Sequence, residues 1–395
     1  MREGWIKKRL TDFVWFQRGF DLPLNNFIEG NVPVYGSTSI LGFHNVAKVK
    51  APGIITGRSG TLGKFQFSNQ DFWPHNTTLW VKDFKGNNEK FAYYLLKTLD
   101  FTLFNSGVAV PSLNRNLLNA YIINIPPLET QRKIAKILSN YDDLIENNLK
   151  RIKLLEEMAQ QTYEEWFVRM RFPGYETATI NETTGLPEGW ERATIGEYYE
   201  TSSGGTPSRQ NEKFYNNGTI DWVKTKELKG LFILDSEEKI TEYAISKSSA
   251  KIFPQKTILM GMYGGVHGEG RKSTLGQLGI LSKKSSTNQA CCAFLAKDKY
   301  SYNLGYFYFY LKSKQKDFLN ISMGAAQQNI SQQVIKKFEF IKPLDTILNK
   351  FSIYSDNIFD SILNLQNQNQ RLREARDILL PRLMMGLLNV DDIDL

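Results

Sequence analysis

An internal duplication is the feature that most limits what this chain can fold into. Trp5 near the start recurs as Trp190, and residues 107–126 (GVAVPSLNRNLLNAYIINIP) resemble residues 324–343 (GAAQQNISQQVIKKFEFIKP). Between these anchors, NTTLWVKD from Asn76 resembles NQACCAFLAKD from Asn288. A period of about 200 residues is too long for a solenoid repeat. The sequence therefore predicts a duplicated domain whose second copy is longer in its middle.

Each copy ends in a segment whose apolar spacing indicates a long helix. After Leu128 the chain contains neither Gly nor Pro for about forty residues, and a helix of that length spans about 60 Å. We expect the two helices to pair as an antiparallel coiled coil, with Asn369 as a polar residue that fixes the register. Packing into a domain core and a solvated Asn369 are the alternatives. The apolar positions are Ile134, Ile137, Tyr141, Leu144, Ile145, Leu149, Ile152, Ala159 and Trp166 in the first helix and Ile358, Ile362, Leu365, Leu372, Leu379 and Leu383 in the second.

These patterns predict an α+β chain with two irregular domains joined by two long helices. Apolar residues make up 41% of the chain and charged residues 23%, which is typical of globular proteins. The expected boundaries are a first domain over 1–127, a central helix over 128–170, a linker over 171–189, a second domain over 190–345, a C-terminal helix over 346–388 and an acidic tail over 389–395.

The charge balance favours an anionic partner. The net charge is +8, and the positive excess falls in the two irregular domains. Two basic domains on a helical spacer suit two contacts with one long polyanion, although charged runs are more often simply solvated. Cys291 and Cys292 are adjacent and provide no disulfide framework. With no apolar signal core in MREGWIKKRL, we expect a cytoplasmic protein.

Motifs for catalysis are not found in the sequence. The stretch TGRSGTLGK resembles a phosphate loop, but Phe65 follows Lys64 where a magnesium-binding Ser or Thr is needed. Asp235, Glu237 and Lys239 resemble a nuclease signature of a kind that is common by chance. The three histidines are too scattered for a zinc site. We therefore expect a chain that is not itself an enzyme.

The order of motifs resembles the specificity (S) subunit of type I restriction-modification enzymes over the whole chain. The marks are INIPPLETQRKIAKIL before the first long helix, LPEGW at 186–190, SGGTP at 203–207 and LLPRLMMG after the second helix. Thr130 departs from the family pattern, and the second copy of the IPPL motif, IKPL at 341–344, is degenerate.

The resemblance implies two target recognition domains, each reading one half of a split, asymmetric DNA sequence. It also implies that the helices space these domains and dock two methyltransferase subunits and, through them, the restriction subunits. S-adenosylmethionine, ATP and magnesium would then belong to the partners, with no cofactor in this chain. The alternative is a structural coiled-coil scaffold with two ligand-binding domains that do not bind DNA.

The candidate DNA contacts lie in loops, several of which contain glycine. Small residues let backbone amides approach phosphates, Arg and Lys supply charge, and Asn and Gln can bind adenine. The alternative for each is an ordinary turn or surface residue, and Trp5, Trp80, Trp190 and Trp222 are expected in the core. The candidates are Arg58, Ser59, Thr61, Lys64, Ser112, Asn114 and Arg115 in the first copy and Gly205, Thr206, Ser208, Lys224, Thr225, Tyr263, Arg271, Lys272, Gln327, Gln328 and Asn329 in the second. The residues expected to pair the helices are Ile134, Ile137, Tyr141, Ile152, Ile362, Leu365, Asn369 and Leu372.

Overall fold

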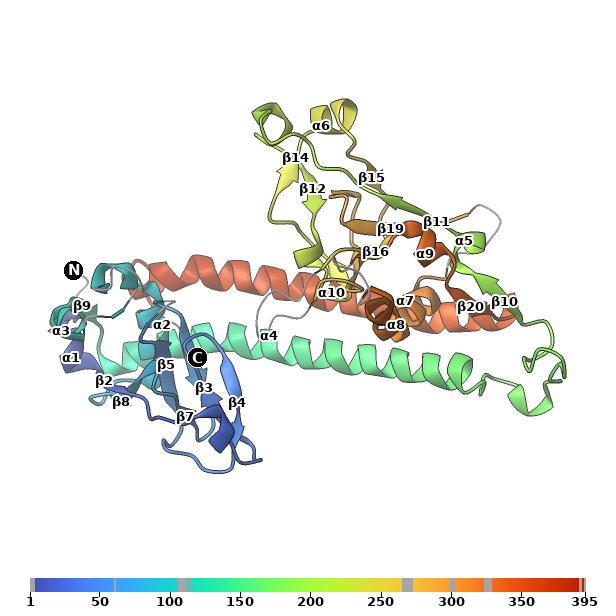
Figure 1. Cartoon of the computed structure of the whole chain (residues 1–395). Coiled ribbons are helices and arrows are strands. Elements are labelled where there is room, and N and C mark those ends of the chain that lie inside the picture. The colour runs from blue at the N-terminus through green and yellow to red at the C-terminus, as the bar shows by residue number, and fades with distance from the viewer. Residues whose placement is uncertain are drawn as a thin grey trace. The chain divides into compact units, whose positions relative to one another are not determined.

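The chain divides into two compact units that each combine a domain with parts of both long helices (Figure 1). The computed structural model describes residues 4–59, 62–105, 112–113, 115–264, 273–297, 303–322, 329–390 and 393. Unit 1 comprises Met1–Glu146 with Gln370–Leu395, and unit 2 comprises Asn147–Asn369. The two long helices are α4 (Leu128–Tyr163) and α10 (Asp345–Met384).

The start of α4 is fixed by one buried side chain. Gln131 donates from Nε2 to the carbonyl of Pro126 and to Oδ1 of Asn87, both at 3.0 Å. Its Oε1 accepts the backbone N–H of Asn88 at 3.0 Å. Asn88 in turn caps α2 (Glu89–Thr98) by accepting from the N–H of Phe91. The same glutamine therefore links the residues that precede α2 with the residue that precedes the start of α4.

Unit 1 contains three small sheets. A four-stranded antiparallel sheet has the order β2 (Trp15–Arg18), β8 (Thr78–Asp83), β5 (Gly53–Gly57) and β6 (Phe65–Ser68). A second sheet consists of β4 (Ile40–His44), β3 (Val32–Tyr35) and β7 (Trp73–Pro74), in which β3 and β7 are parallel. The strand β1 (Ile6–Arg9) pairs with β9 (Ile122–Ile125), between α3 (Arg115–Ala120) and α4.

Unit 2 repeats this pattern with additional strands. Its main sheet has the order β11 (Tyr199–Ser203), β19 (Cys291–Ala296), β16 (Ile258–Gly261), β17 (Leu278–Leu281) and β13 (Phe232–Ile233). A second sheet consists of β14 (Lys239–Ile240), β12 (Ile220–Val223), β18 (Ser285–Thr287) and β15 (Ile252–Phe253), and β12 is parallel to β18. The strand β10 (Glu191–Thr194) pairs with β20 (Glu339–Lys342).

The strand ladders define which residues of the two copies correspond. Gly57 pairs with Thr78 in unit 1, and Gly261 pairs with Cys291 in unit 2. Thr78 therefore corresponds to Cys291, so that Asn76 corresponds to Gln289. The sequence alignment, which matched Asn76 with Asn288, was wrong by one residue because backbone pairing sets the register, whatever the side-chain identity.

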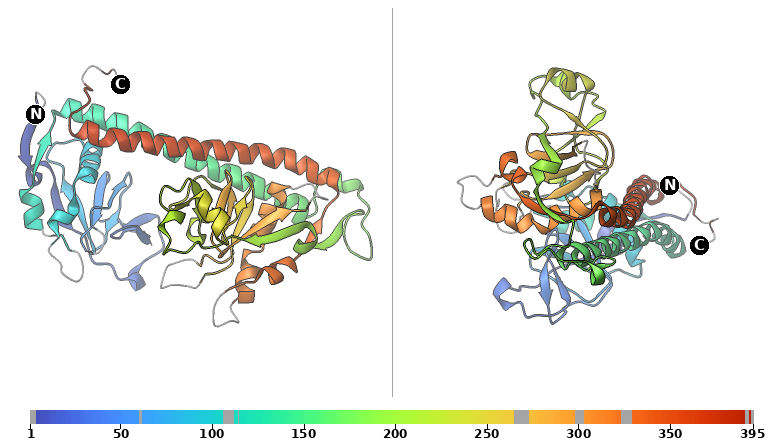
Figure 2. Two further views of the ribbon diagram at one scale, coloured as in Figure 1. Left: turned by 90° about the horizontal axis from the view of Figure 1, so that it is seen from above. Right: turned by 90° about the vertical axis from the view of Figure 1, so that its right-hand side faces the viewer.

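The core of each unit is shared between its domain and the long helices. In unit 1, buried residues of α2 pack with Leu138 of α4 and Leu383 of α10. In unit 2, α7 (Leu304–Ser313) packs with Tyr163 of α4 and Phe359 of α10, and Figure 2 shows the unit 2 strands beside their part of α10. The remaining α-helices described in unit 2 are α5 (Ile195–Tyr198), α6 (Glu242–Lys247), α8 (Gln315–Ser322) and α9 (Gln332–Lys336). Trp5, Trp80, Trp190 and Trp222 are buried, which confirms the expectation that they lie in the core.

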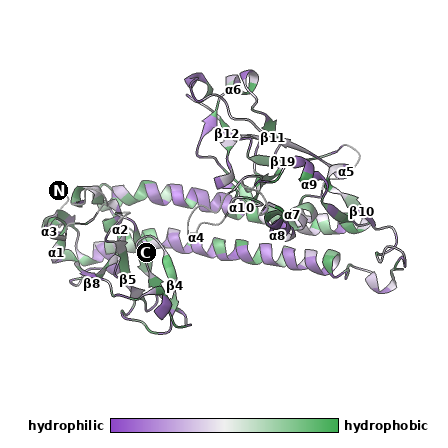
Figure 3. Ribbon diagram, in the orientation of Figure 1, coloured by the Kyte–Doolittle hydropathy of each residue, from purple (hydrophilic) through white to green (hydrophobic). Residues whose placement is uncertain are grey.

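The apolar seam of α4 differs from the sequence reading at two positions. Leu144 and Leu149 were expected in the seam but are about half exposed, at 52% and 48%. The buried positions instead recur every seven residues as Leu138, Ile145, Ile152 and Ala159, so Leu144 and Leu149 lie outside the buried stripe. Of the residues expected to pair the helices, Ile134, Ile152, Ile362, Leu365 and Asn369 are buried, and Ile137, Tyr141 and Leu372 are half-buried. Figure 3 shows the resulting alternation of hydrophilic and hydrophobic residues along both helices.

Along the described part of the chain, none of the helices combines the length and apolar character needed to cross a membrane.

Candidate functional site

The same close backbone approach occurs in both units, directly after β2 and β11. A Cβ atom on Gly19 would lie 2.1 Å from the carbonyl oxygen of His75. A Cβ atom on Gly204 would lie 1.9 Å from the carbonyl oxygen of Thr287. Any side chain would collide with backbone at these distances, so both positions require glycine. This approach brings the segment after each glycine against the turn that precedes β8 or β19.

An indole fixes the next residue in each unit. Trp73 donates from Nε1 to the carbonyl of Phe20 at 3.3 Å, and Trp222 donates from Nε1 to the carbonyl of Gly205 at 3.0 Å. Phe20 and Gly205 directly follow the two corresponding glycines. Trp73 belongs to β7 whereas Trp222 belongs to β12, so the two units place an indole at the same backbone position from different strands.

Cations lie over both indole rings. The Nζ of Lys48 is 4.9 Å from the ring centroid of Trp73. In unit 2, the Nζ of Lys224 is 4.9 Å and the guanidinium carbon of Arg209 is 5.2 Å from the ring centroid of Trp222. These distances are within the range of cation–π attraction. Each unit therefore has positive charge beside the tryptophan that is hydrogen-bonded to the backbone.

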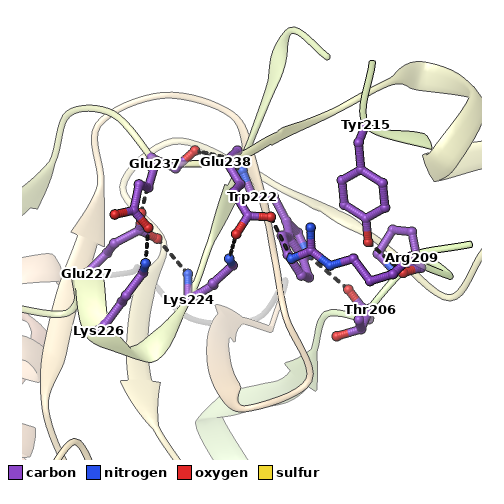
Figure 4. A network of polar contacts seen from close by, with 12 residues as sticks. Thr206, Arg209, Tyr215, Trp222, Lys224, Lys226, Glu227, Glu237 and Glu238 are labelled. Carbon is purple, nitrogen blue, oxygen red and sulfur yellow. Dashed lines mark hydrogen bonds and ion pairs between the residues drawn. The ribbon is translucent and has the colours of Figure 1, made fainter. Parts of the chain in front are cut away.

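A carboxylate holds the two cations of unit 2 together, as Figure 4 shows. Glu238 forms an ion pair with Arg209 at 2.5 Å and a second ion pair with Lys224. The guanidinium of Arg209 also stacks 4.5 Å from the ring of Tyr215, and its side chain is 55% exposed. Burial, followed by repulsion from Arg209, lowers the pKa of Lys224. A second anion, such as a phosphate, would reduce this repulsion between the cations.

A pair of hydrogen-bonded polar side chains lies at corresponding positions of the two units. Asn76 donates from Nδ2 to Oδ1 of Asp21, and the hydroxyl of Thr206 donates to Oε1 of Gln289. Asp21 and Thr206 each lie two residues after the corresponding glycines. The first-copy cluster is defined here as Asp21, Lys48, Trp73 and Asn76, and the second-copy cluster as Thr206, Arg209, Trp222, Lys224, Glu238 and Gln289.

The structure also brings together loops that the sequence selected separately. Ser59 pairs with Ser112 through backbone in unit 1, and Tyr263 pairs with Asn329 in unit 2. These two pairs correspond, because Ser59 lies two residues after Gly57 and Tyr263 lies two residues after Gly261. The N–H of Arg58 bonds to the carbonyl of Thr77 at 2.9 Å, directly after Asn76. The predicted loops and the first-copy cluster are therefore neighbours.

The other predicted residues have varied surroundings. Gly205 is buried, Thr206 and Lys224 belong to the second-copy cluster, Ser208 is exposed beside Arg209, and Thr225 follows Lys224. Lys64 is exposed, and Arg115 is the first residue of α3. Thr61, Asn114, Arg271, Lys272, Gln327 and Gln328 lie outside the described residues. The assignment of all these residues as DNA contacts stays a prediction.

Sequence reasoning missed several members of the clusters. It did not select Asp21, Lys48, Trp73, Asn76, Arg209, Glu238 or Gln289. The available signal was the glycine directly after β2 and β11. Gly19 follows Trp5 at the same spacing as Gly204 follows Trp190. The correspondence between Asn76 and Gln289 required the strand register.

Both carboxylates that resembled a nuclease signature form ion pairs with lysines, Asp235 with Lys239 and Glu237 with Lys226. Lys239 is 3.1 Å from Oδ1 of buried Asp221 and 2.9 Å from Asp235, and Lys283 is 2.7 Å from Oδ2 of Asp221. Asp235 and Asp221 together raise the pKa of Lys239. Within the described ranges, no three His, Cys, Asp or Glu side chains gather closely enough to hold a metal ion.

The fold and the repeated clusters define a class of duplicated α+β proteins with two matching sites. The family described as "Type I restriction modification DNA specificity domain" matches residues 2–157 and 187–369. The chain therefore belongs to this family, as its motifs suggested.

Named relatives agree with this assignment. The type I restriction enzyme MjaIX specificity subunit of Methanocaldococcus jannaschii is 28% identical over 312 residues, which cover 77% of this chain and 70% of the relative. The EcoR124I/EcoR124II specificity subunit of Escherichia coli is 24% identical, covering 87% of this chain and 85% of the relative. The crystal structure of a type I S subunit from M. genitalium matches with a TM-score of 0.63 at 16% identity, covering 96% of both chains, and so shares the fold.

Proposed function

We propose that this chain is the DNA sequence-recognition subunit of a type I restriction-modification complex, in which each unit reads one half of a split target. The observation that carries the proposal is the pair of corresponding clusters, one in each unit. Both combine an indole-bound backbone turn, cations and polar side chains, which are the groups that contact phosphates and base edges. The side chains differ between the clusters, so the two half-sites differ in sequence.

The long helices space the two units as an antiparallel coiled coil. Contacts within each unit support this arrangement. In unit 2, Asn148 donates to Oδ1 of Asn369 at 3.0 Å, and Thr162 donates to the hydroxyl of Tyr354 at 3.1 Å. In unit 1, Arg376 of α10 forms an ion pair with Asp142 of α4. Residue numbers rise along α4 as those of their partners fall along α10, as antiparallel pairing requires.

Two identical partner subunits dock on this chain, one on each unit. Matching hollows support this stoichiometry. A hollow of about 370 Å³ in unit 1 is lined by α2, β9 and the end of α10. A hollow of about 480 Å³ in unit 2 is lined by α7, β20 and the end of α4. The partners that family membership supports are methyltransferase subunits, which in turn carry the restriction subunits. S-adenosylmethionine, ATP and magnesium bind these partners, and the chain itself performs no catalysis.

Measuring the mass of the complex with its methyltransferase tests this assembly. The wild-type chain should bind two methyltransferase subunits at saturation. Met385→Asp in the unit 1 hollow and Val168→Asp in the unit 2 hollow should each leave one bound, since both side chains are about 60% exposed at the rims. Binding of a single subunit to the wild type would contradict the proposal.

A gel shift with duplex DNA tests recognition. The complex should retard a random duplex weakly and one target sequence strongly. Absence of any shift, alone and with the partner, would favour the scaffold interpretation.

A further inference from the structure

We propose that Asn76 and Gln289 each read an adenine, one in each half-site, and that Asp21 and Thr206 are the positioning residues that orient their amides. This inference rests on the proposed DNA-recognition function and adds the residues that select a base. Neither amide was selected by the sequence, and they are not the same residue type. Their equivalence comes from the backbone alone.

Backbone hydrogen bonds establish that equivalence independently of the strand ladder. The N–H of His75 bonds to the carbonyl of Tyr35 at the end of β3 at 2.9 Å. The N–H of Asn288 bonds to the carbonyl of Val223 at the end of β12 at 3.0 Å. Asn76 and Gln289 directly follow these two residues. Both amides therefore occupy the second position of the same turn, which lies between β7 and β8 in unit 1 and between β18 and β19 in unit 2.

The hydrogen-bonding capacity of both amides suits adenine. Asn76 uses one of its two N–H groups on Asp21, which leaves one donor and the carbonyl acceptor. Gln289 uses one lone pair on Thr206, which leaves one lone pair and both N–H groups. A donor beside an acceptor on one amide can bind N7 and the N6 amino group of adenine simultaneously. The hydrogen bond to Asp21 or Thr206 holds each amide in place before DNA binds, which reduces the conformational entropy lost on binding.

Positive charge around both amides supplies the phosphate contacts that a base reader requires. Arg18 donates from Nε to the backbone carbonyl of Asn76 at 3.4 Å. Thr206, which binds Gln289, is three residues from Arg209. Phosphate contacts of this kind fix the register in which a base-reading side chain meets its base edge.

The two positioning residues impose different degrees of selectivity. The Asp21 carboxylate only accepts hydrogen bonds, so it fixes which end of the Asn76 amide faces outward. The Thr206 hydroxyl can donate or accept, so the Gln289 amide can turn over and present either edge. We therefore expect stricter adenine selection by unit 1 than by unit 2.

Selection of binding sites from a randomised duplex pool tests this inference, using the complex with its methyltransferase partner. Asn76→Ala should relax one adenine position in one half-site by about 5- to 100-fold, and Gln289→Ala should relax one adenine in the other half-site. In each variant, the unaffected half-site reports that the complex still folds and binds. Gln70→Ala in unit 1 and Asn216→Ala in unit 2 are exposed amide controls that should leave the consensus unchanged.

Near-isosteric variants keep the test valid if the alanine variants fold poorly. Gln289→Glu, and Asn76→Asp combined with Asp21→Asn so that residue 21 donates to the new carboxylate, lose the donor to adenine N7. Both should shift the base from adenine toward cytosine, whose N4 amino group a carboxylate accepts. An unchanged consensus in all four variants would overturn the inference. So would a uniform loss of affinity with the same consensus, because that is the behaviour of phosphate contacts. A wild-type complex that selects no consensus would instead refute the proposed function.

Discussion

Replacing one or both of the buried amides that join the long helices should change the free energy of unfolding in different ways. A single replacement leaves one buried amide without this partner, whereas a double replacement removes the pair. Asn148 and Asn369 are only 6% and 2% exposed, and their side chains are joined by a hydrogen bond of 3.0 Å. Asn369→Leu removes the acceptor and leaves the Asn148 amide with only its longer contact, 3.4 Å, to Gln368. Losing a buried partner costs about 1–3 kcal/mol of the free energy of unfolding. The double leucine variant removes both amides and should recover most of that loss.

A double-mutant cycle measured by thermal unfolding provides the assay. At about 2–4 °C per kcal/mol, each single leucine variant should lower Tm by several degrees, whereas the double variant should unfold near or above the wild-type temperature. Ser361→Ala, on an exposed face of α10, is the matched control. A double variant that loses the sum of the two single effects would refute the reasoning, because the amides would then act independently. The double variant should also accept a wider range of gaps between half-sites, because a buried Asn specifies helix register.

Three further predictions concern charge, thiols and helix length. Glu238→Gln removes the carboxylate from Arg209 and Lys224, so binding to random duplex should tighten about threefold with a steeper salt dependence; Glu237→Gln, which affects only Lys226, is the control. Burial raises the pKa of the Cys292 thiol to about 12, so the thiol should resist a thiol reagent at pH 8 until urea unfolds the chain. Because the unfolded thiol ionises near pH 9, its contribution to stability is complete below pH 9 and should be lost as the pH rises toward 12. Removing seven residues from facing turns of α4 and α10 shortens each by about 10 Å, so the gap should shrink by about 3 bp with both half-sites unchanged.

The sequence was sufficient to predict the mixed helix and sheet content and the two long helices. Local features carry that information: the recurrence of Trp5 as Trp190, the prolines before α4 and α10, and the heptad spacing. The seam of α4 was less predictable, because Leu144 and Leu149 also follow helical spacing and only packing shows that Ile145 takes the buried position. The division of each long helix between the two units was also not predictable, because it depends on contacts between residues that are far apart in the chain.

The site was predictable only where a motif lies within one loop. Gly205 and Thr206 were selected because glycine and polar residues are adjacent in one loop, and Lys224 was selected with Thr225 in the loop after Trp222. All three contribute to or adjoin the second-copy cluster. Trp73 and Trp222 could not be matched from the sequence, because Trp73 lies on the second strand of the parallel pair β3–β7 whereas Trp222 lies on the first strand of the parallel pair β12–β18. Glu238 is distant in sequence from Arg209, so no local pattern reveals that it binds this cation.

The central claim is that the two units of this chain each read one half of a split DNA target. Methylation-aware sequencing of DNA from cells that carry the methyltransferase, with and without this chain, tests it most directly. The account predicts a methylated motif that depends on the chain and consists of two different half-sites separated by unread bases. One continuous motif, or methylation that is the same with and without the chain, would contradict it.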